Sequence, residues 1–118
     1  MDFETVQAYL LNKKGTTEER PFGPDALVYK VMGKMFALIA EGSDPLRISL
    51  KCDPNDALAL RDMYTAVTPG YHLNKRHWNT VTANGTIPND EFWRMIDQSY
   101  DLVVQGLTRK VRAELDSL

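Results

Sequence analysis

Apolar residues recur at helical spacing in four segments of the chain, which predicts four amphipathic helices. The expected helices span residues 2–14, 54–67, 89–107 and 109–115. Each begins beside a side chain that can accept hydrogen bonds from the free backbone amides of the first helical turn. These expected capping residues are Asp2, Asp53, Asn89 and Thr108. Gly15 and the Pro69-Gly70 pair are breakers that end the first two helices.

The segments between these helices alternate in the manner of β-strands and are separated by short turns. The expected strands span residues 26–32, 35–41, 46–52 and 78–83, with a short edge strand near 19–22. In the third of them, the polar residues Arg47, Ser49 and Lys51 alternate with apolar ones, so we expect one face to be open to solvent. Short turns favour an antiparallel meander. The order of elements predicts an α+β fold, with helices packed on one face of an antiparallel sheet.

The composition is typical of an ordinary globular protein. The 118 residues, 43% apolar and 25% charged, predict a single domain spanning 1–118. A net charge of −2 gives no general attraction to nucleic acid or to an anionic membrane. We find no signal-peptide pattern and no apolar run long enough to span a membrane. Cys52 is the only cysteine, which fits a reducing cytoplasm, and we expect a cytoplasmic monomer.

One stretch, residues 69–83, departs from this balance because no Asp or Glu occurs between Asp62 and Asp90. It carries His72, Asn74, Lys75, Arg76, His77 and Trp78. The basic residues Lys30, Arg47 and Lys51 fall on the predicted open faces of neighbouring strands. Together they predict a locally basic surface that could contact phosphates, with an aromatic residue available for stacking. The alternative is a solvated sheet face whose charges pair with nearby acids, with Trp78 at the edge of the core.

The sequence offers no recognisable catalytic or metal-binding pattern. His72 and His77 are five residues apart with no carboxylate in their stretch, so they do not form a zinc motif. Cys52 falls on the inward face of its strand, where a thiol is inert. Ser99 lies within a helix and lacks the GxSxG context of a hydrolase nucleophile. No nucleotide-binding glycine motif is present. We therefore expect no catalytic residue, no metal and no cofactor.

Several segments resemble the MmcQ/YjbR family of small bacterial proteins. They read PFGPDALVYKVMGKMFALIA, ISLKCDP, PGYHLNKRHWNTV and DQSYDLVVQGL, and the resemblance covers almost the whole chain. It implies a CyaY-like (frataxin-like) fold in a cytoplasmic bacterial protein. It also implies sheet-based binding of DNA by a "double wing" arrangement, with Asn79 and Thr80 among the motif positions. The acidic ridge that frataxin uses for iron is not matched, because Lys13 and Lys14 follow Asp2 and Glu4 in the first helix.

Three functional hypotheses follow, and the third, an enzyme, lacks an activated nucleophile or a set of metal ligands. The first is a non-enzymatic protein that binds double-stranded DNA. Its candidate contact residues are Lys30, Arg47, Lys51, His72, Asn74, Lys75, Arg76, His77 and Trp78. The alternative is a module that binds a protein or a small ligand through the same loop and has no role with nucleic acid.

Overall fold

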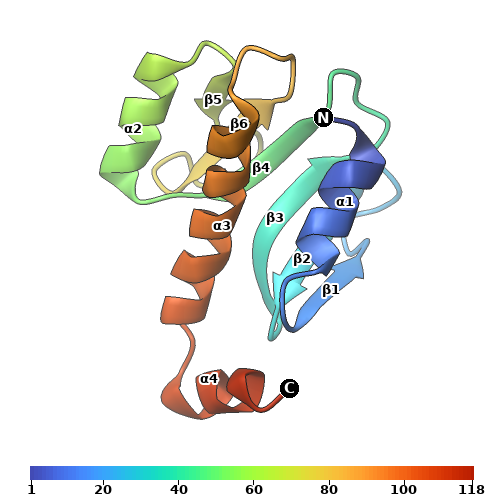
Figure 1. Ribbon diagram of the computed structural model, residues 1–118, viewed down its shortest axis with the longest axis vertical. Coiled ribbons are helices and arrows are strands. Elements are labelled where there is room, and N and C mark those ends of the chain that lie inside the picture. The colour runs from blue at the N-terminus through green and yellow to red at the C-terminus, as the bar shows by residue number, and fades with distance from the viewer.

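The computed structural model describes all 118 residues and contains ten regular elements around a single sheet (Figure 1). The helices are α1 Phe3–Leu11, α2 Pro54–Met63, α3 Asn89–Gln105 and α4 Arg109–Asp116. The strands are β1 Thr16–Glu19, β2 Ala26–Val31, β3 Lys34–Ala40, β4 Arg47–Lys51, β5 Val67–Pro69 and β6 Trp78–Thr82. All neighbouring strands are antiparallel, in the order β1-β2-β3-β4-β6-β5. The predicted α+β class with an antiparallel sheet is confirmed.

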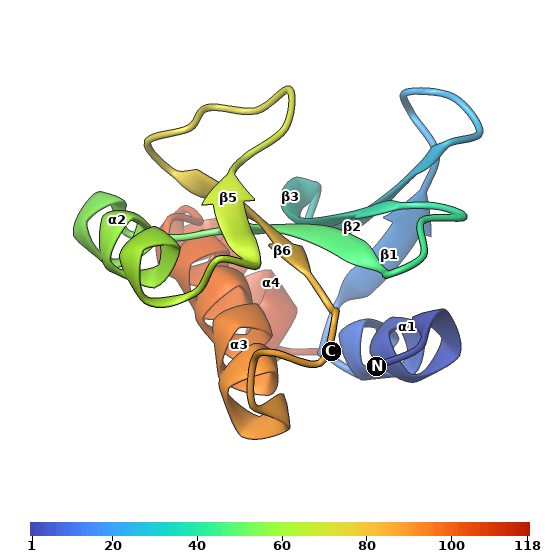
Figure 2. The ribbon, with the colours of Figure 1, turned by 90° about the horizontal axis from the view of Figure 1, so that it is seen from above.

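The helices lie on one side of the sheet and leave the other side open (Figures 1 and 2). Helix α3 packs along β3 and β4, α1 packs on β1, and α2 packs against β5 and β6. The fully buried side chains between these layers include Tyr29, Phe36, Ile48, Val81, Phe92 and Ile96. The open side therefore has no layer of the chain over it. No helix combines the length and hydrophobicity that a membrane span requires.

The strand register decides which side chains reach the open face. Ser49 pairs with Thr80, Lys51 with Trp78, and Arg47 with Thr82, between β4 and β6. The residues between them on β4, Ile48 and Leu50, belong to the core, so the predicted alternation of side-chain directions is confirmed, but Ser49 is also buried and is not open to solvent as expected. Because successive residues of a strand point to opposite faces, Arg47, Ser49 and Lys51 lie on the open side.

Two predicted elements differ in the structure. Helix α2 ends at Met63, because the next residue, Tyr64, has extended backbone angles of φ −126° and ψ 122°. Val67 then belongs to β5 and pairs with Val81, which buries it in the sheet instead of on a helix. The edge strand β1 begins at Thr16, directly after the turn at Gly15, and not near residue 19.

One of the four expected helix caps is absent, and the β2–β3 turn contains two residues with positive φ. The β2–β3 turn uses Met32 and Gly33, which have φ of 50° and 82°, as a two-residue hairpin turn requires. Helix α3 is preceded by Pro88 and has no side-chain cap, so Asn89 does not serve as one. The caps predicted at Asp2, Asp53 and Thr108 each accept a hydrogen bond from a first-turn amide.

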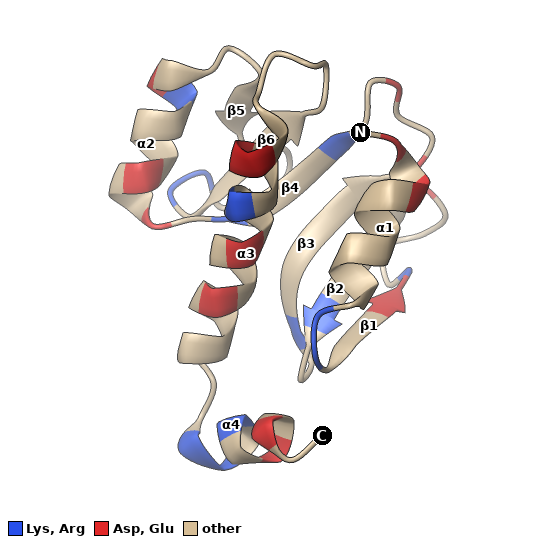
Figure 3. Ribbon diagram, in the orientation of Figure 1, with Lys and Arg blue, Asp and Glu red and all other residues tan.

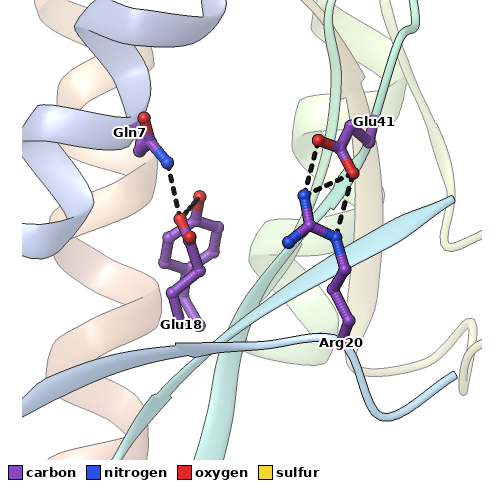
Figure 4. Close-up of polar contacts among 5 residues, drawn as sticks. Gln7, Glu18, Arg20 and Glu41 are labelled. Atoms are coloured by element: carbon purple, nitrogen blue, oxygen red, sulfur yellow. Dashed lines mark hydrogen bonds and ion pairs between the residues drawn. The ribbon is translucent and has the colours of Figure 1, made fainter. Parts of the chain in front are cut away.

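Polar contacts fix the strands that frame the open face (Figure 4). Glu18 accepts hydrogen bonds from Gln7 at 2.7 Å and from Tyr29 at 2.6 Å, which ties β1 to α1 and β2. Arg20 donates to both carboxylate oxygens of Glu41, at 2.7 and 2.8 Å. This second contact anchors the start of the β1–β2 connection to the residue that follows β3.

Ser99, in the middle of α3, joins the helix layer to the sheet. Its hydroxyl donates to the carbonyl of Phe36 at 2.5 Å and accepts from the amide of Lys51 at 2.8 Å. It is completely buried. These two backbone groups belong to neighbouring strands, so one serine side chain satisfies both where the β3–β4 pairing ends.

Candidate functional site

Two loops rise from the open face on opposite sides of the sheet (Figure 2). Loop 20–25 joins β1 to β2, and loop 70–77 joins β5 to β6. Between them lies a cavity of about 540 Å³, which we call the trough. It is lined by Phe22, Asp25, Ala26, Leu38, Ala40, Glu41, Arg47, Ser49, Tyr71, His72, Leu73 and Thr80. Its size falls in the range of pockets that hold small organic ligands.

One side of the trough floor is apolar, and the other side carries two hydroxyl groups. Ala26, Leu38 and Ala40 supply the apolar part from β2 and β3. The hydroxyls of Ser49 and Thr80 bond to each other at 2.8 Å, and both residues are almost completely buried. Thr80 also accepts a hydrogen bond from the amide of Tyr71 at 3.1 Å. This contact holds the start of loop 70–77 against the floor.

The walls carry two exposed aromatic side chains. Phe22 in loop 20–25 is 71% exposed, and Tyr71 in loop 70–77 is 68% exposed. The ring of His72 lies beside that of Tyr71, with 4.0 Å between their centroids. His72 has a φ of 58°, the left-handed region that residues other than glycine rarely adopt. Backbone strain of this kind gathers at ligand-binding loops.

The charges around the trough are unequally neutralised. Arg20 and Glu41 form an ion pair at 2.7 Å, so the carboxylate of Glu41 is already engaged. Arg47 is exposed and has no carboxylate within ion-pair distance. Asp25 is likewise exposed and unpaired, at the start of β2. The trough therefore presents one free cation, Arg47 on β4, and one free anion, Asp25 at the end of loop 20–25.

Loop 70–77 is held in place by side chains that bond to its backbone. Arg61 of α2 donates to the carbonyls of Lys75 and Trp78, and to Oδ1 of Asn79 at 2.7 Å. Asn79 is buried and donates in turn to the carbonyl of Ala57 at 3.3 Å. The ammonium of Lys75 donates a hydrogen bond to the carbonyl of Gly70 at 3.0 Å, across the loop. The cationic groups of Arg61 and Lys75 therefore shape the loop.

A second, smaller hollow lies on the α2 side of loop 70–77. Its volume is about 340 Å³, and it is lined by Pro54, Asn55, Leu58, Arg61, Lys75 and Arg76. Arg76 has no ion-pair partner, whereas the other two cations bond to loop carbonyls. Figure 3 shows acidic positions along α2 and α3, while the loop behind them is basic.

The residues predicted to contact DNA are thus divided among several places. Arg47 and His72 line the trough, and Lys75 and Arg76 line the second hollow. Lys30 lies nearer the β1 edge and pairs with Glu19 at 2.9 Å, as the alternative of a neutralised sheet face anticipates.

The remaining predicted residues support the loop or lie at its base. Oδ1 of Asn74 accepts a hydrogen bond from the amide of Arg76 at 3.0 Å, which closes a turn within the loop. The carbonyl of His77 accepts from the amide of Cys52 at 2.8 Å. Lys51 and Trp78 are half-buried partners across the β4–β6 pairing. Trp78 is not among the residues packed against the core, and its pairing with Lys51 places it on the open side, so the expectation that it lies at the edge of the core was wrong.

The groups considered for nucleophilic chemistry have structural surroundings. Both functions of the Ser99 hydroxyl, donor and acceptor, are used by backbone groups. Cys52 is 7% exposed, and burial raises the pKa of its thiol from 9.0 to about 11. No three His, Cys, Asp or Glu residues are grouped closely enough to hold a metal ion.

Sequence reasoning did not identify three of the residues that define the site. Phe22 and Tyr71 are aromatic residues in loops, and only their exposure in the fold separates them from core residues. Arg61 carries no motif. Its place near the end of α2, beside Asp62, gives no signal of a role in holding the loop.

Comparisons with known proteins agree on one family. A family model named YjbR matches residues 11–102. The uncharacterized protein YjbR of Escherichia coli K12 is 31% identical over 118 residues, covering all of both chains. The uncharacterized protein YbdF of Escherichia coli O157:H7 is 39% identical over 90 residues, 76% of this chain and 74% of that protein.

Solved structures show the same fold. The crystal structure of Deinococcus radiodurans protein DR2400, a DUF419 domain, superposes with a TM-score of 0.91 at 38% identity. The match covers 96% of this chain and 86% of that one. A Pseudomonas syringae protein superposes with a TM-score of 0.74 at 30% identity, covering 86% of this chain and 98% of that one.

Proposed function

The chain belongs to the YjbR family, and from that premise we propose that it is a non-enzymatic binding protein whose trough takes a ligand. The single observation that carries this proposal is the trough itself. Its floor combines apolar side chains with a hydroxyl pair, exposed aromatic residues flank it, and one arginine in it has no partner. Concave sites that are mostly apolar with a few polar groups are the usual form of ligand sites.

The placement of the nucleophiles supports binding over catalysis. An activated nucleophile needs a neighbouring base and a third group that orients the base. The hydroxyl of Ser99 is used to satisfy two backbone groups inside the core. The thiol of Cys52 is buried, and its raised pKa keeps it protonated near neutral pH. We place this binding function in the cytoplasm and in a monomer, and light scattering after size-exclusion chromatography tests the oligomeric state.

The test is a screen of small organic fragments by heteronuclear NMR on ¹⁵N-labelled protein. We expect bound fragments to shift the amides of Leu38, Ser49, Tyr71 and Thr80 more than those of the helical side. The variant Ala40→Phe places a ring over the trough floor and should abolish these shifts. Thr17→Phe, at an exposed position of β1 that does not line the trough, is the matched control. Fragments that bind only elsewhere, or bind Ala40→Phe unchanged, refute the proposal.

Double-stranded DNA is the second candidate ligand, and three unpaired cations favour it. Arg47 and Lys51 lie on the open face of β4, and Arg76 lies in loop 70–77. In this arrangement loops 20–25 and 70–77 are the two wings, and the cations between and beside them contact phosphates.

A labelled duplex titrated at low and moderate salt tests the second candidate. Binding should weaken steeply with salt, with a slope of about 0.9 per phosphate contacted. It should also fall in a Lys51→Glu/Arg76→Glu variant, with Arg109→Glu/Lys110→Glu on α4 as the control of equal charge change. These substitutions avoid Lys75, which shapes the loop. If the protein binds no duplex even at low salt, double-stranded DNA is excluded as the ligand.

A further inference from the structure

We propose that the occupant of the trough is a molecule that joins a flat ring to one anionic group, a carboxylate or a phosphate. This inference rests on the proposed function, because it names the ligand class of the same site. An aromatic carboxylate and a nucleoside monophosphate are two sources of that shared chemistry.

The distribution of aromatic side chains argues for the ring. The chain contains four Phe, five Tyr and two Trp residues. Only Phe22 and Tyr71 are exposed, and both line the trough, from opposite loops. Exposed aromatic rings leave apolar surface in contact with water, and a stacked partner would cover that surface. Each ring face can stack on another flat ring. Two such rings at one cavity are most simply explained by a ligand that covers them.

The free guanidinium of Arg47 argues for the anionic group. The other arginine near the trough, Arg20, is neutralised by Glu41 through two carboxylate oxygens. Of the two lysines on the adjoining open face, Lys30 is neutralised by Glu19, and Lys51 does not line the trough. Arg47 lines the trough without such a partner. A guanidinium offers a planar fork of donors that matches the two oxygens of a carboxylate or phosphate.

Asp25 fixes how such a ligand would lie. Ala26 pairs with Ala40, and the β3–β4 register places Ala40 beside Arg47. The backbones of Asp25 and Arg47 are therefore separated by about two strand spacings, roughly 10 Å. The unpaired carboxylate of Asp25 repels an anion on its side of the trough, so the anionic group lies over β4. The ring then extends toward the aromatic side chains of the two loops.

The test measures the dissociation constants of six probes at low ionic strength by NMR titration. The ring-bearing anions are adenosine monophosphate and indole-3-acetate, and their neutral counterparts are adenosine and indole-3-acetamide. Inorganic phosphate and acetate are the anions without a ring. We expect at least one ring-bearing anion to bind tenfold or more tightly than its neutral counterpart and than the bare anion. Which of the two binds more tightly distinguishes the phosphate source from the carboxylate source.

Substitutions on the two charged walls give effects of opposite sign. Arg47→Gln should reduce affinity for the preferred ring-bearing anion at least tenfold and abolish its advantage over the neutral probe. Asp25→Asn should raise that affinity severalfold. Tyr71→Ala should weaken the binding of anionic and neutral ring probes alike, and Arg109→Gln should change nothing. All four positions are exposed, so we expect the variants to fold.

The outcomes separate this inference from the proposal on which it rests. If neutral and anionic rings bind equally, or if Arg47→Gln preserves the preference, the ligand class is wrong. The trough remains a binding site in that case, provided that fragments of other chemistry still shift its amides. If no probe and no fragment shifts the amide signals of the trough residues, both the ligand class and the proposed function are refuted.

Discussion

Replacing Arg61 by methionine should destabilise the protein and release loop 70–77. The substitution keeps most of the aliphatic stem and removes the guanidinium, which bonds to Asn79 at 2.7 Å and to the carbonyls of Lys75 in the loop and Trp78 at its end. Because Asn79 is 2% exposed, water cannot easily replace the lost donor. A buried acceptor left without a partner costs ~1–3 kcal/mol, and each of the two loop bonds contributes ~0.5–1.5 kcal/mol. We expect the free energy of unfolding to fall by about 2–6 kcal/mol, a large part of the usual stability of a domain.

Urea unfolding followed by tryptophan fluorescence and by circular dichroism measures this change. For a domain of this size the transition midpoint should fall by on the order of 2 M urea. Arg76→Met is the matched control, because that arginine lies in loop 70–77 itself and its side chain has no ion-pair partner. Surface changes of this kind stay within ~0.5 kcal/mol. In the folded variant, the amide signals of Tyr71 and His72 should broaden or shift.

A double-mutant cycle with Asn79→Ala tests the proposed cause. If Arg61 acts through Asn79, the double variant should be more stable than the sum of the single effects predicts, by about 1 kcal/mol or more. Additive effects would show that the two residues act independently. A loss no larger than that of Arg76→Met would refute the assignment of Arg61 as the residue that positions the loop.

Three further predictions concern the scaffold around the site. Ser99→Ala should lower the free energy of unfolding by ~2–4 kcal/mol in urea titrations, because it leaves two backbone groups without a partner in the core; a loss below ~1 kcal/mol contradicts this role. Gly70→Ala should destabilise the fold by ~1–3 kcal/mol, since its Cβ would lie 2.7 Å from Cβ and 2.9 Å from the carbonyl oxygen of Trp78; unchanged thermal unfolding would show that the loop yields freely. The raised pKa of Cys52 means that the folded state holds the thiol proton more tightly than the unfolded state, so stability present below pH 9 is lost toward pH 11. Across that range the stability of the wild type should fall more steeply than that of Cys52→Ala, and parallel curves would be the contrary result.

The fold was largely predictable wherever a local pattern carried the information. The alternation of β4 and the caps at Asp2, Asp53 and Thr108 depend on residues close in sequence, and the structure confirms them. The strand β5 has only three residues, too few to show a period of two. Its pairing with β6 is decided by burial of Val67 against the core, which no local pattern reports. The prediction that extended α2 to that residue was wrong for this reason.

The site was less predictable, because its chemistry depends on contacts between distant segments. The acid-free stretch correctly marked a loop rich in basic residues, but charge alone does not say where a side chain is directed. Lys75 bonds to a carbonyl of its own loop, and Asn74 closes a turn. Phe22 and Tyr71 lie almost fifty positions apart in the sequence and come together at one cavity only because β1 to β6 form a single sheet.

Loop 70–77 therefore carries two kinds of residue, and they test different hypotheses. Tyr71, His72 and Leu73 line the trough, whereas Lys75 and Arg76 line the hollow beside α2. A ligand of the trough should respond to Tyr71→Ala and not to Arg76→Glu, and a duplex bound through phosphates should show the reverse order. A ligand that responds equally to both substitutions would have to cover both sides of the loop. A single-stranded nucleic acid, with bases that stack and a backbone that follows cations, is a chemistry that meets this requirement.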